Sequence, residues 1–144
     1  MKDETLRSPW VQVETQVQTT LPKAWDSWTQ PSAITQWNYA SEEWHCPKAT
    51  NELSPGGRFN WRMEAKDGSI GFDFSGTYDQ IAPLESIAYT LDDGRSARVR
   101  FVESGEGVTV SHAFEAEATN SIEMQKMGWQ AILDNFKRYV EASS

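Results

Sequence analysis

The C-terminal segment constrains the fold more than any other part of the chain. From residue 120 to residue 142 no proline interrupts the sequence, and the apolar residues recur with the period of an α-helix. They stand at i, i+3, i+4, i+7 and i+11, as Trp129, Ile132, Leu133, Phe136 and Val140. Asn120, followed three residues later by Glu123, matches a capping box and predicts that the helix begins at Asn120. A helix about 33 Å long with one apolar stripe requires a broad apolar surface to cover that stripe.

The preceding part of the chain supplies this surface as strands. Six segments alternate apolar and polar residues with a period of two, and turn signals such as Lys66-Asp67-Gly68 separate neighbouring segments. The segments are residues 10–19, 58–64, 70–78, 87–91, 99–101 and 108–114. Because each has one apolar and one polar face, they predict an antiparallel sheet with one face toward solvent.

Two short helices and a loop separate the first two predicted strands. Pro22 and Pro31 each stand near the start of a helical stretch, where a missing N–H costs little. Each stretch carries an apolar pair at i, i+3, namely Trp25 with Trp28 and Ile34 with Trp37. Residues 41–57, which end in Ser-Pro-Gly-Gly, are predicted to form a long polar loop.

This order of elements predicts an α+β fold with a cavity. The elements are a six-stranded curved antiparallel sheet, a long C-terminal helix, and two short helices between strands 1 and 2. A twisted sheet of six strands cannot contact one helix along all of its strands, so we expect an aromatic-walled gap between them. We expect one domain over residues 10–142, preceded by a flexible N-terminus at residues 1–9.

Composition excludes several classes of function. The net charge is −8 and the 13 Lys and Arg residues are scattered, which argues against binding to nucleic acids or anionic membranes. No apolar stretch is long enough for insertion into a membrane. One cysteine and two histidines, far apart, give no zinc-ligand spacing, and no glycine-rich phosphate loop is present. We therefore expect a cytoplasmic protein with no metal and no cofactor, either a monomer or a weak homodimer.

Several short motifs, in order, resemble those of a known superfamily. They are Leu21-Pro22 through Trp37, the run 53–59 (LSPGGRF), Asp67-Gly68, the run 76–83 (GTYDQIAP), Tyr89-Thr90, and Gly128-Trp129 before Leu133. Over residues 10–141 the chain resembles the START-like superfamily, also called SRPBCC or Bet v 1-like. Within it, the chain is most similar to the branch named after the activator of heat shock protein 90 ATPase.

The resemblance implies a helix-grip fold, in which the sheet wraps around the C-terminal helix and encloses a deep pocket. In various relatives this pocket holds lipids, steroids, polyketides or other hydrophobic molecules, and some relatives catalyse cyclisation or dehydration there. The eukaryotic namesake stimulates a chaperone ATPase and has an additional N-terminal domain. The 144 residues here leave no room for that domain, so chaperone regulation is the least favoured function.

The candidate ligand-binding residues are those whose alternation or helical spacing points them into the predicted gap. They are Trp37, Trp61, Phe72, Phe74, Tyr78, Tyr89, Phe101, His112, Trp129, Leu133 and Phe136. Tyr78 and Tyr89 offer hydroxyl groups to a ligand. The same residues would also serve as a packed core, and Trp44 would either cap the mouth of the cavity or only fix the loop.

His112 is the candidate for catalysis. Its imidazole could act as an acid or base in a cyclase or dehydratase, and the alternative is a core histidine satisfied by a neighbouring hydroxyl. His45 and Cys46 are adjacent, so in an extended chain they point to opposite faces and would not readily meet as a catalytic pair; Cys46 is interpreted as a loop residue. Binding of a small hydrophobic or aromatic molecule, without catalysis, is the favoured hypothesis.

Overall fold

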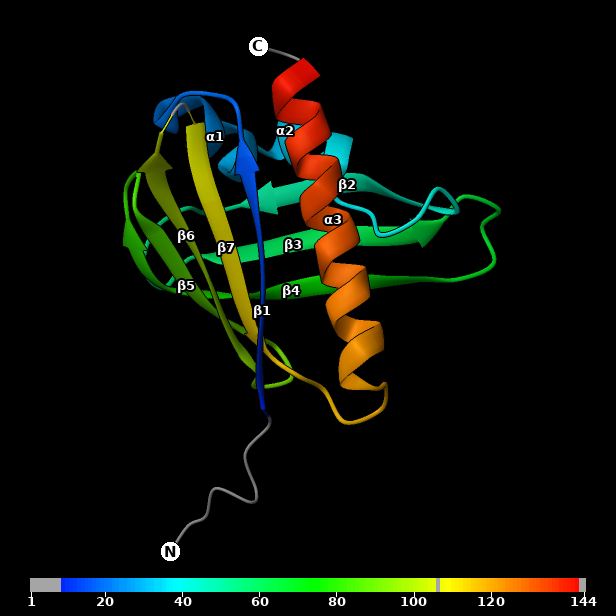
Figure 1. Ribbon diagram of the computed structural model, residues 1–144. Coiled ribbons are helices and arrows are strands. Elements are labelled where there is room, and N and C mark those ends of the chain that lie inside the picture. The colour runs from blue at the N-terminus through cyan, green and yellow to red at the C-terminus, as the bar shows by residue number, and fades with distance from the viewer. Residues whose placement is uncertain (1–8, 106, 143–144) are drawn as a thin grey trace, which may run out of the picture.

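The computed structural model describes residues 9–105 and 107–142, and it contains one sheet and three helices (Figure 1). The elements are β1 (Trp10–Val17), α1 (Leu21–Thr29), α2 (Pro31–Trp37), β2 (Trp44–Asn51), β3 (Arg58–Ala65), β4 (Gly71–Ala82), β5 (Ser86–Leu91), β6 (Ser96–Ser104), β7 (Gly107–Glu115) and α3 (Ile122–Ala142). Except for Pro9, the N-terminus that we predicted to be flexible lies outside the described residues.

The sheet is antiparallel throughout, with the strand order β1-β7-β6-β5-β4-β3-β2. The α+β helix-grip fold is confirmed, but the sheet has seven strands instead of six. The missed strand is β2, which lies within the segment predicted to be a loop. Its sequence is polar and contains Pro47, and the pairing with β3 shifts between His45 and Lys48. An edge strand with a bulge tolerates a proline. The alternation of apolar and polar residues that indicates a strand is absent from this segment, and the sequence therefore predicts a loop there.

The sheet is strongly curved. Figure 1 shows β2, β3 and β4 running across the view, whereas β5, β6, β7 and β1 run steeply. The change of direction falls between β4 and β5, where the pairing shifts between Tyr78 and Gln80. Close contact at this bend requires glycine, because a Cβ atom on Gly76 would lie 2.3 Å from the carbonyl oxygen of Thr90 on β5.

The short helices begin as their prolines predict. Pro22 and Pro31 occupy the first turns of α1 and α2, and the Thr20 hydroxyl caps α1 by accepting a hydrogen bond from the Lys23 N–H at 3.3 Å. The buried side chains of both helices face the interior and close one end of the sheet.

Helix α3 begins at Ile122, two residues after the predicted start. The Ser121 hydroxyl accepts a hydrogen bond from the Met124 N–H at 3.1 Å, which makes Ser121 the N-cap. The capping box predicted for Asn120 is therefore wrong. The Asn120 side-chain amide instead donates to Glu117 at 2.6 Å in the loop before the helix.

Helix α3 also covers the free edge of β1. Side chains of Gln130 and Lys137 donate to the carbonyl oxygens of Glu14 at 3.3 Å and Gln16 at 2.6 Å. These bonds satisfy main-chain groups that an edge strand otherwise leaves open to another chain. They also fix α3 beside β1, and the main chain of the helix stays away from that of β3 and β4.

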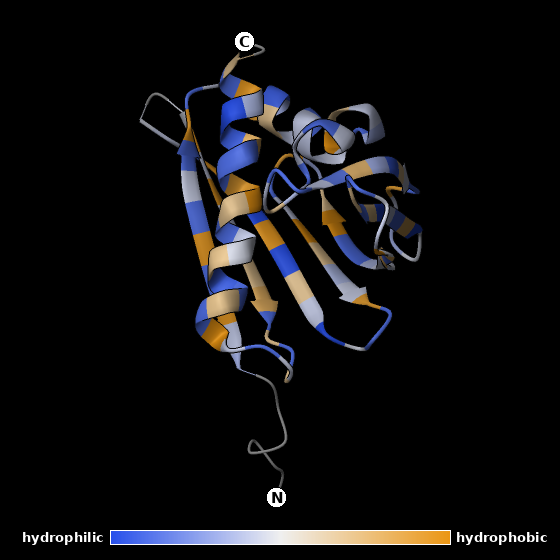
Figure 2. Cartoon of the chain, turned by 90° about the vertical axis from the view of Figure 1, so that its right-hand side faces the viewer, coloured by the Kyte–Doolittle hydropathy of each residue, from blue (hydrophilic) through white to orange (hydrophobic). Residues whose placement is uncertain are grey.

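The core lies between the inner face of the sheet and α3. Apolar and polar residues alternate along the strands, as Figure 2 shows by colour. Leu133, Phe136 and Val140 of the predicted stripe are fully buried, whereas Trp129 and Ile132 are only partly buried. The first half of the stripe therefore does not fully meet the sheet. Of the described helices, none is long and apolar enough to cross a membrane.

Candidate ligand-binding cavity

An apolar cavity of about 250 Å³ occupies the space between α3 and the curved sheet. All three helices and five of the strands contribute to its wall. The lining residues are Trp28, Trp37, Asn38, Ala40, Trp44, Trp61, Met63, Phe72, Phe74, Tyr89, His112, Trp129, Ile132 and Leu133. Five of the seven tryptophans of the chain are among them, so the wall is mainly aromatic.

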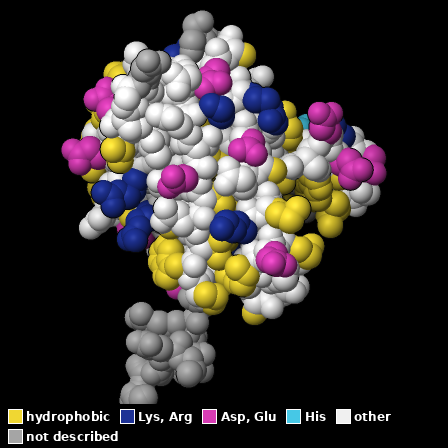
Figure 3. Space-filling model, in the orientation of Figure 1, with side chains coloured by type: hydrophobic (Ala, Val, Ile, Leu, Met, Phe, Trp, Pro, Cys, Tyr) yellow, Lys and Arg dark blue, Asp and Glu magenta, His cyan; other side chains and the backbone are white. Residues whose placement is uncertain are grey.

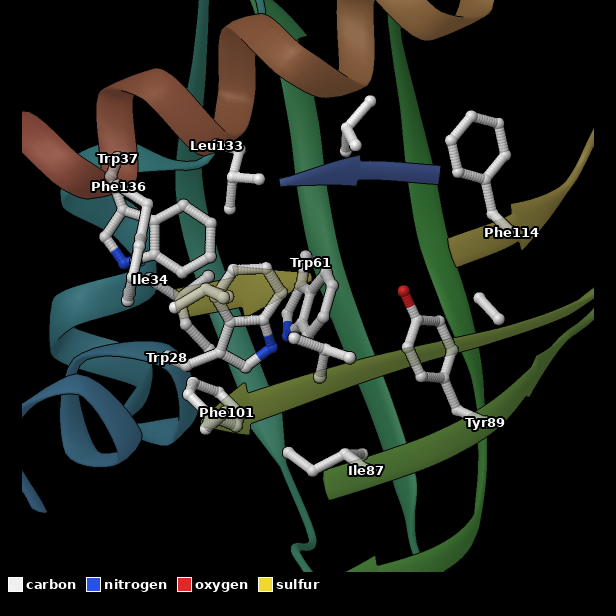
Figure 4. Close-up of a cluster of buried hydrophobic side chains, with 14 of the residues drawn as sticks. Trp28, Ile34, Trp37, Trp61, Ile87, Tyr89, Phe101, Phe114, Leu133 and Phe136 are labelled. Atoms are coloured by element: carbon white, nitrogen blue, oxygen red, sulfur yellow. The ribbon is translucent and has the colours of Figure 1, made fainter. Parts of the chain in front are cut away.

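Eight of the eleven predicted ligand-binding residues line this cavity. The other three, Tyr78, Phe101 and Phe136, are buried in the layer behind it. Phe136 packs edge-on against Trp28 and Trp37, each with ring centroids 5.1 Å away, and Phe101 packs against Trp28 at 6.1 Å (Figure 4). These two rings hold the indoles in place from behind.

The Tyr78 hydroxyl has a structural partner instead of a place in the cavity. It donates to the side-chain oxygen of Asn51 at 2.9 Å, and the Trp61 indole N–H donates to the same oxygen at 3.0 Å. Asn51 in turn donates to the carbonyl oxygen of Thr29 at 2.7 Å. This network joins β2, β3, β4 and α1, and it fixes the orientation of the Trp61 ring at the cavity wall.

Sequence reasoning missed five lining residues besides Trp44. Trp28 packs against two predicted residues, Phe101 and Phe136. Met63 lies two residues after Trp61 and therefore on the same face of β3. Ile132 belongs to the predicted stripe. Asn38 and Ala40 follow α2 in a segment without periodicity, and no pattern in the sequence indicates them.

The cavity opens to the surface beside Trp44 and Phe72. These rings meet edge-on with centroids 5.8 Å apart, and Phe72 is 48% exposed although it lines the cavity. Figure 3 shows hydrophobic side chains gathered in a hollow between α3 and the ends of β2, β3 and β4. Trp44 therefore lies at the mouth, one of its two predicted positions.

His112 and Tyr89 form a buried polar pair on the sheet side of the cavity. The Tyr89 hydroxyl oxygen lies 2.6 Å from Nε2 of His112, and the tautomer of the imidazole decides which group donates. Indole rings of Trp28 and Trp129 pack edge-on against the imidazole at 5.3 Å and 4.8 Å. Burial lowers the pKa of His112 to about 3 and raises the pKa of Tyr89, so both groups are neutral at pH 7.

His45 and Cys46 lie on opposite faces of β2. His45 faces the surface, 4.0 Å from a carboxylate oxygen of Glu64, whereas Cys46 is buried and belongs to a strand instead of the predicted loop. Burial raises the pKa of the Cys46 thiol to about 11, so it is not a thiolate nucleophile at neutral pH. Within residues 9–105 and 107–142 no group of three or more metal-binding side chains is present.

Comparisons with known proteins agree with this architecture. Residues 18–141 match the family model described as Activator of Hsp90 ATPase homolog 1-like protein. The solution structure of an AHSA1-like protein from Aeromonas hydrophila is 40% identical, covers 94% of each chain and has a TM-score of 0.88. A solution structure from Cytophaga hutchinsonii is 44% identical over 92% of each chain, with a TM-score of 0.80.

More distant structures share the fold alone. A crystal structure from Nitrosomonas europaea is 15% identical, covers 94% of this chain and 96% of its own, and has a TM-score of 0.82. No functionally curated protein matches the chain.

Proposed function

The chain belongs to the Activator of Hsp90 ATPase homolog 1-like family, and on this basis we propose that it binds a small hydrophobic, aromatic molecule in the cavity between α3 and the sheet. The observation that carries the proposal is the cavity itself. It is apolar, it reaches the surface beside Phe72, and its wall consists mainly of aromatic rings. Walls of this kind, with a few polar groups among apolar side chains, are typical of small-molecule sites.

The volume of the cavity limits the size of the ligand. An apolar cavity of about 150 Å³ in another protein accommodates benzene. At about 250 Å³, the present cavity is larger by more than half, which favours a molecule of two fused rings, such as naphthalene or indole. Sterols and long-chain lipids exceed this volume.

The state of His112 favours binding over catalysis. With a pKa of about 3, its imidazole holds no extra proton to donate at neutral pH and is a weak base. Its Nε2 atom is already engaged by the Tyr89 hydroxyl. A neutral imidazole with this nitrogen already paired fits a core histidine better than an acid or base, so we do not assign a cyclase or dehydratase reaction to the cavity.

Isothermal titration calorimetry tests the proposed function. Naphthalene and indole are added to the protein, and each is expected to give a saturable heat of binding as its rings enter the aromatic cavity. Two variants of α3 supply a matched comparison. Ile132→Trp fills the cavity and is expected to weaken binding at least tenfold, whereas Ile122→Trp changes an exposed residue outside the cavity and leaves binding unchanged. Failure of both compounds to bind the wild-type protein, or equal binding by both variants, would overturn the proposal.

A further inference from the structure

Several buried polar groups at the cavity lack a hydrogen-bond partner among the described residues, and those of Asn38 and Trp28 are two of them. The Asn38 side chain lines the cavity and the residue is only 6% exposed, yet neither end of its carboxamide is paired within the described chain. Trp28 also lines the cavity and is 4% exposed, and its indole N–H has no acceptor among the described residues. Buried polar groups are paired in the great majority of cases, so two such groups at one cavity need an explanation.

Several buried groups of the same kinds are paired, both at the cavity and away from it. The indole N–H of Trp37 donates to the carbonyl oxygen of Ser27 at 2.9 Å, and that of Trp61 donates to Asn51. The carboxamide of Asn135, as buried as that of Asn38, donates to the carbonyl oxygen of Tyr39 at 2.7 Å and accepts from Arg138. Of the three buried carboxamides among the described residues, those of Asn38, Gln125 and Asn135, only that of Asn38 is therefore unpaired.

The main chain around Asn38 is held in place. Its N–H donates to the carbonyl oxygen of Ile34 at 3.0 Å, which ends α2. On the next residue, the Tyr39 carbonyl oxygen accepts the bond from Asn135 of α3. Asn38 is thus fixed on both sides, and its carboxamide offers both a donor and an acceptor at a defined place on the wall.

A third polar atom lies on the sheet side. The Tyr89 hydroxyl makes one hydrogen bond with His112, and in either tautomer it retains the capacity for another. Figure 4 shows the Tyr89 hydroxyl pointing from β5 toward α3, and the Trp28 nitrogen pointing away from α1. A ligand would therefore find hydrogen-bonding groups at few points within an otherwise apolar wall.

Charge separates the ligands that fit from those that do not. Of the described residues that line the cavity, none is Asp, Glu, Lys or Arg. An ionised carboxylate or ammonium group placed there would lose its hydration without gaining a counter-charge, which is strongly unfavourable. Acidic residues also outnumber basic residues over the whole chain, and the resulting net charge of −8 disfavours the approach of anions.

Building on the proposed function, we infer that the ligand is an uncharged aromatic molecule with one hydrogen-bonding substituent, and that the Asn38 carboxamide binds this substituent. A hydroxyl or a carboxamide group on the ring system meets this requirement. Burying the ring alone would leave Asn38 unpaired in the complex. One hydrogen bond between the neutral substituent and the buried Asn38 carboxamide is expected to improve affinity about tenfold over a ligand that lacks the substituent.

Three probes of similar shape test the inference: naphthalene, 2-naphthol and 2-naphthoate. We expect the wild-type protein to bind 2-naphthol about tenfold more tightly than naphthalene and 2-naphthoate more weakly than both. Asn38→Leu keeps the branched shape of the side chain and removes its polar atoms, so the preference for 2-naphthol should fall below twofold. Asn60→Leu is the matched control, because Asn60 alternates with Phe59 and Trp61 onto the outer face of β3, and it should keep the full preference.

The outcomes distinguish this inference from the proposed function. An unchanged preference in Asn38→Leu, or tight binding of 2-naphthoate, overturns the inference while binding of naphthalene still supports the proposed function. If none of the probes binds, both fail. If Asn38→Leu does not fold, Asn38→Ala, which also removes the polar atoms, gives the same test. Its preference for 2-naphthol over naphthalene should fall below twofold as well, and an unchanged preference contradicts the inference.

Discussion

Burial changes the chemistry of His112 from that of an ordinary surface histidine. Its ring lies between Trp28 and Trp129, and its Nε2 atom meets the Tyr89 hydroxyl. The unfolded chain takes up a proton near pH 6.5, whereas the folded chain accepts one only at about pH 3. Between these values the unfolded state binds more protons, so His112 destabilises the fold as the pH falls below 6.5.

His112→Gln should remove this effect. Below pH 6.5 the free energy of unfolding of the wild-type protein is expected to fall relative to the variant by about 1.4 kcal/mol per pH unit, since one proton is involved. Urea denaturation of both proteins at pH 7, 6 and 5 measures the difference. Asp92 and Glu117, whose pKa values Arg58 and Asn120 lower, also weaken the fold in acid, but equally in both proteins. Parallel pH profiles would show that His112 is accessible to protons in the native state.

Part of the cavity wall follows from the sequence at the level of single residues. Alternation places Trp61, Phe74 and His112 on the inner face of their strands, because strand geometry fixes the direction of each side chain. Asn38 lies outside any periodic segment, and its position depends on how α2 ends beside α3. Tyr78 has the correct alternation, but a bond to Asn51 of the unpredicted strand β2 holds it in the core.

At the scale of elements, two glycines of the family-like motifs have opposite roles. A Cβ atom on Gly76 would overlap the main chain of β5, so this glycine permits the bend of the sheet. A Cβ atom on Gly128, within α3, meets nothing within 4 Å. Glycine inside a helix lowers its stability relative to alanine, so Gly128 has a conformational cost without a packing reason.

Gly128→Ala is expected to raise the free energy of unfolding by about 1 kcal/mol, because alanine favours the helix and the new methyl group has space. Gly76→Ala should instead lower it by about 1–3 kcal/mol through overpacking against Thr90. Chemical denaturation of the two variants measures both values. A loss of stability in Gly128→Ala would mean that α3 packs more closely at this position than the structure indicates.

The elements themselves differ in how well the sequence predicts them. Segments with clear periodicity, such as β3 and the second half of α3, follow directly from the spacing of apolar residues. Strand β2 escapes prediction because an edge position lets it keep polar residues and Pro47, and its pairing depends on β3. The start of α3 is predicted at Asn120 because both Asn120 and Ser121 are good N-cap residues. In the structure only the Ser121 hydroxyl accepts a hydrogen bond from the first turn, so the predicted start is wrong.

At the scale of the whole molecule, curvature of the sheet and attachment of α3 to β1 together create the cavity. The bond from Lys137 to Gln16 and that from Gln130 to Glu14 hold the helix at one edge of the sheet. The bend between β4 and β5 carries Trp61 and Phe74 across to the other side of the space. Neither feature is local, so periodicity can predict a gap but not its volume.

A ligand in this cavity should stabilise the entire fold. At a free concentration of 100 times the dissociation constant, 2-naphthol is expected to raise the free energy of unfolding by about 2.7 kcal/mol, because only the folded chain has the cavity. Denaturation with and without the compound measures this difference, and for the Ile132→Trp variant, which should bind at least tenfold more weakly, the same concentration should give no more than about 1.4 kcal/mol. No stabilisation of the wild-type protein would mean that the compound does not bind the folded chain selectively.

At the mouth of the cavity, the rings of Trp44 and Phe72 meet edge-on. We expect a guest molecule to pass by rotation of these two rings, and such rotations are far faster than the opening of a strand or helix. Exchange with the surroundings would then leave the backbone hydrogen bonds intact, so the residence time would depend on the interior contacts and not on unfolding.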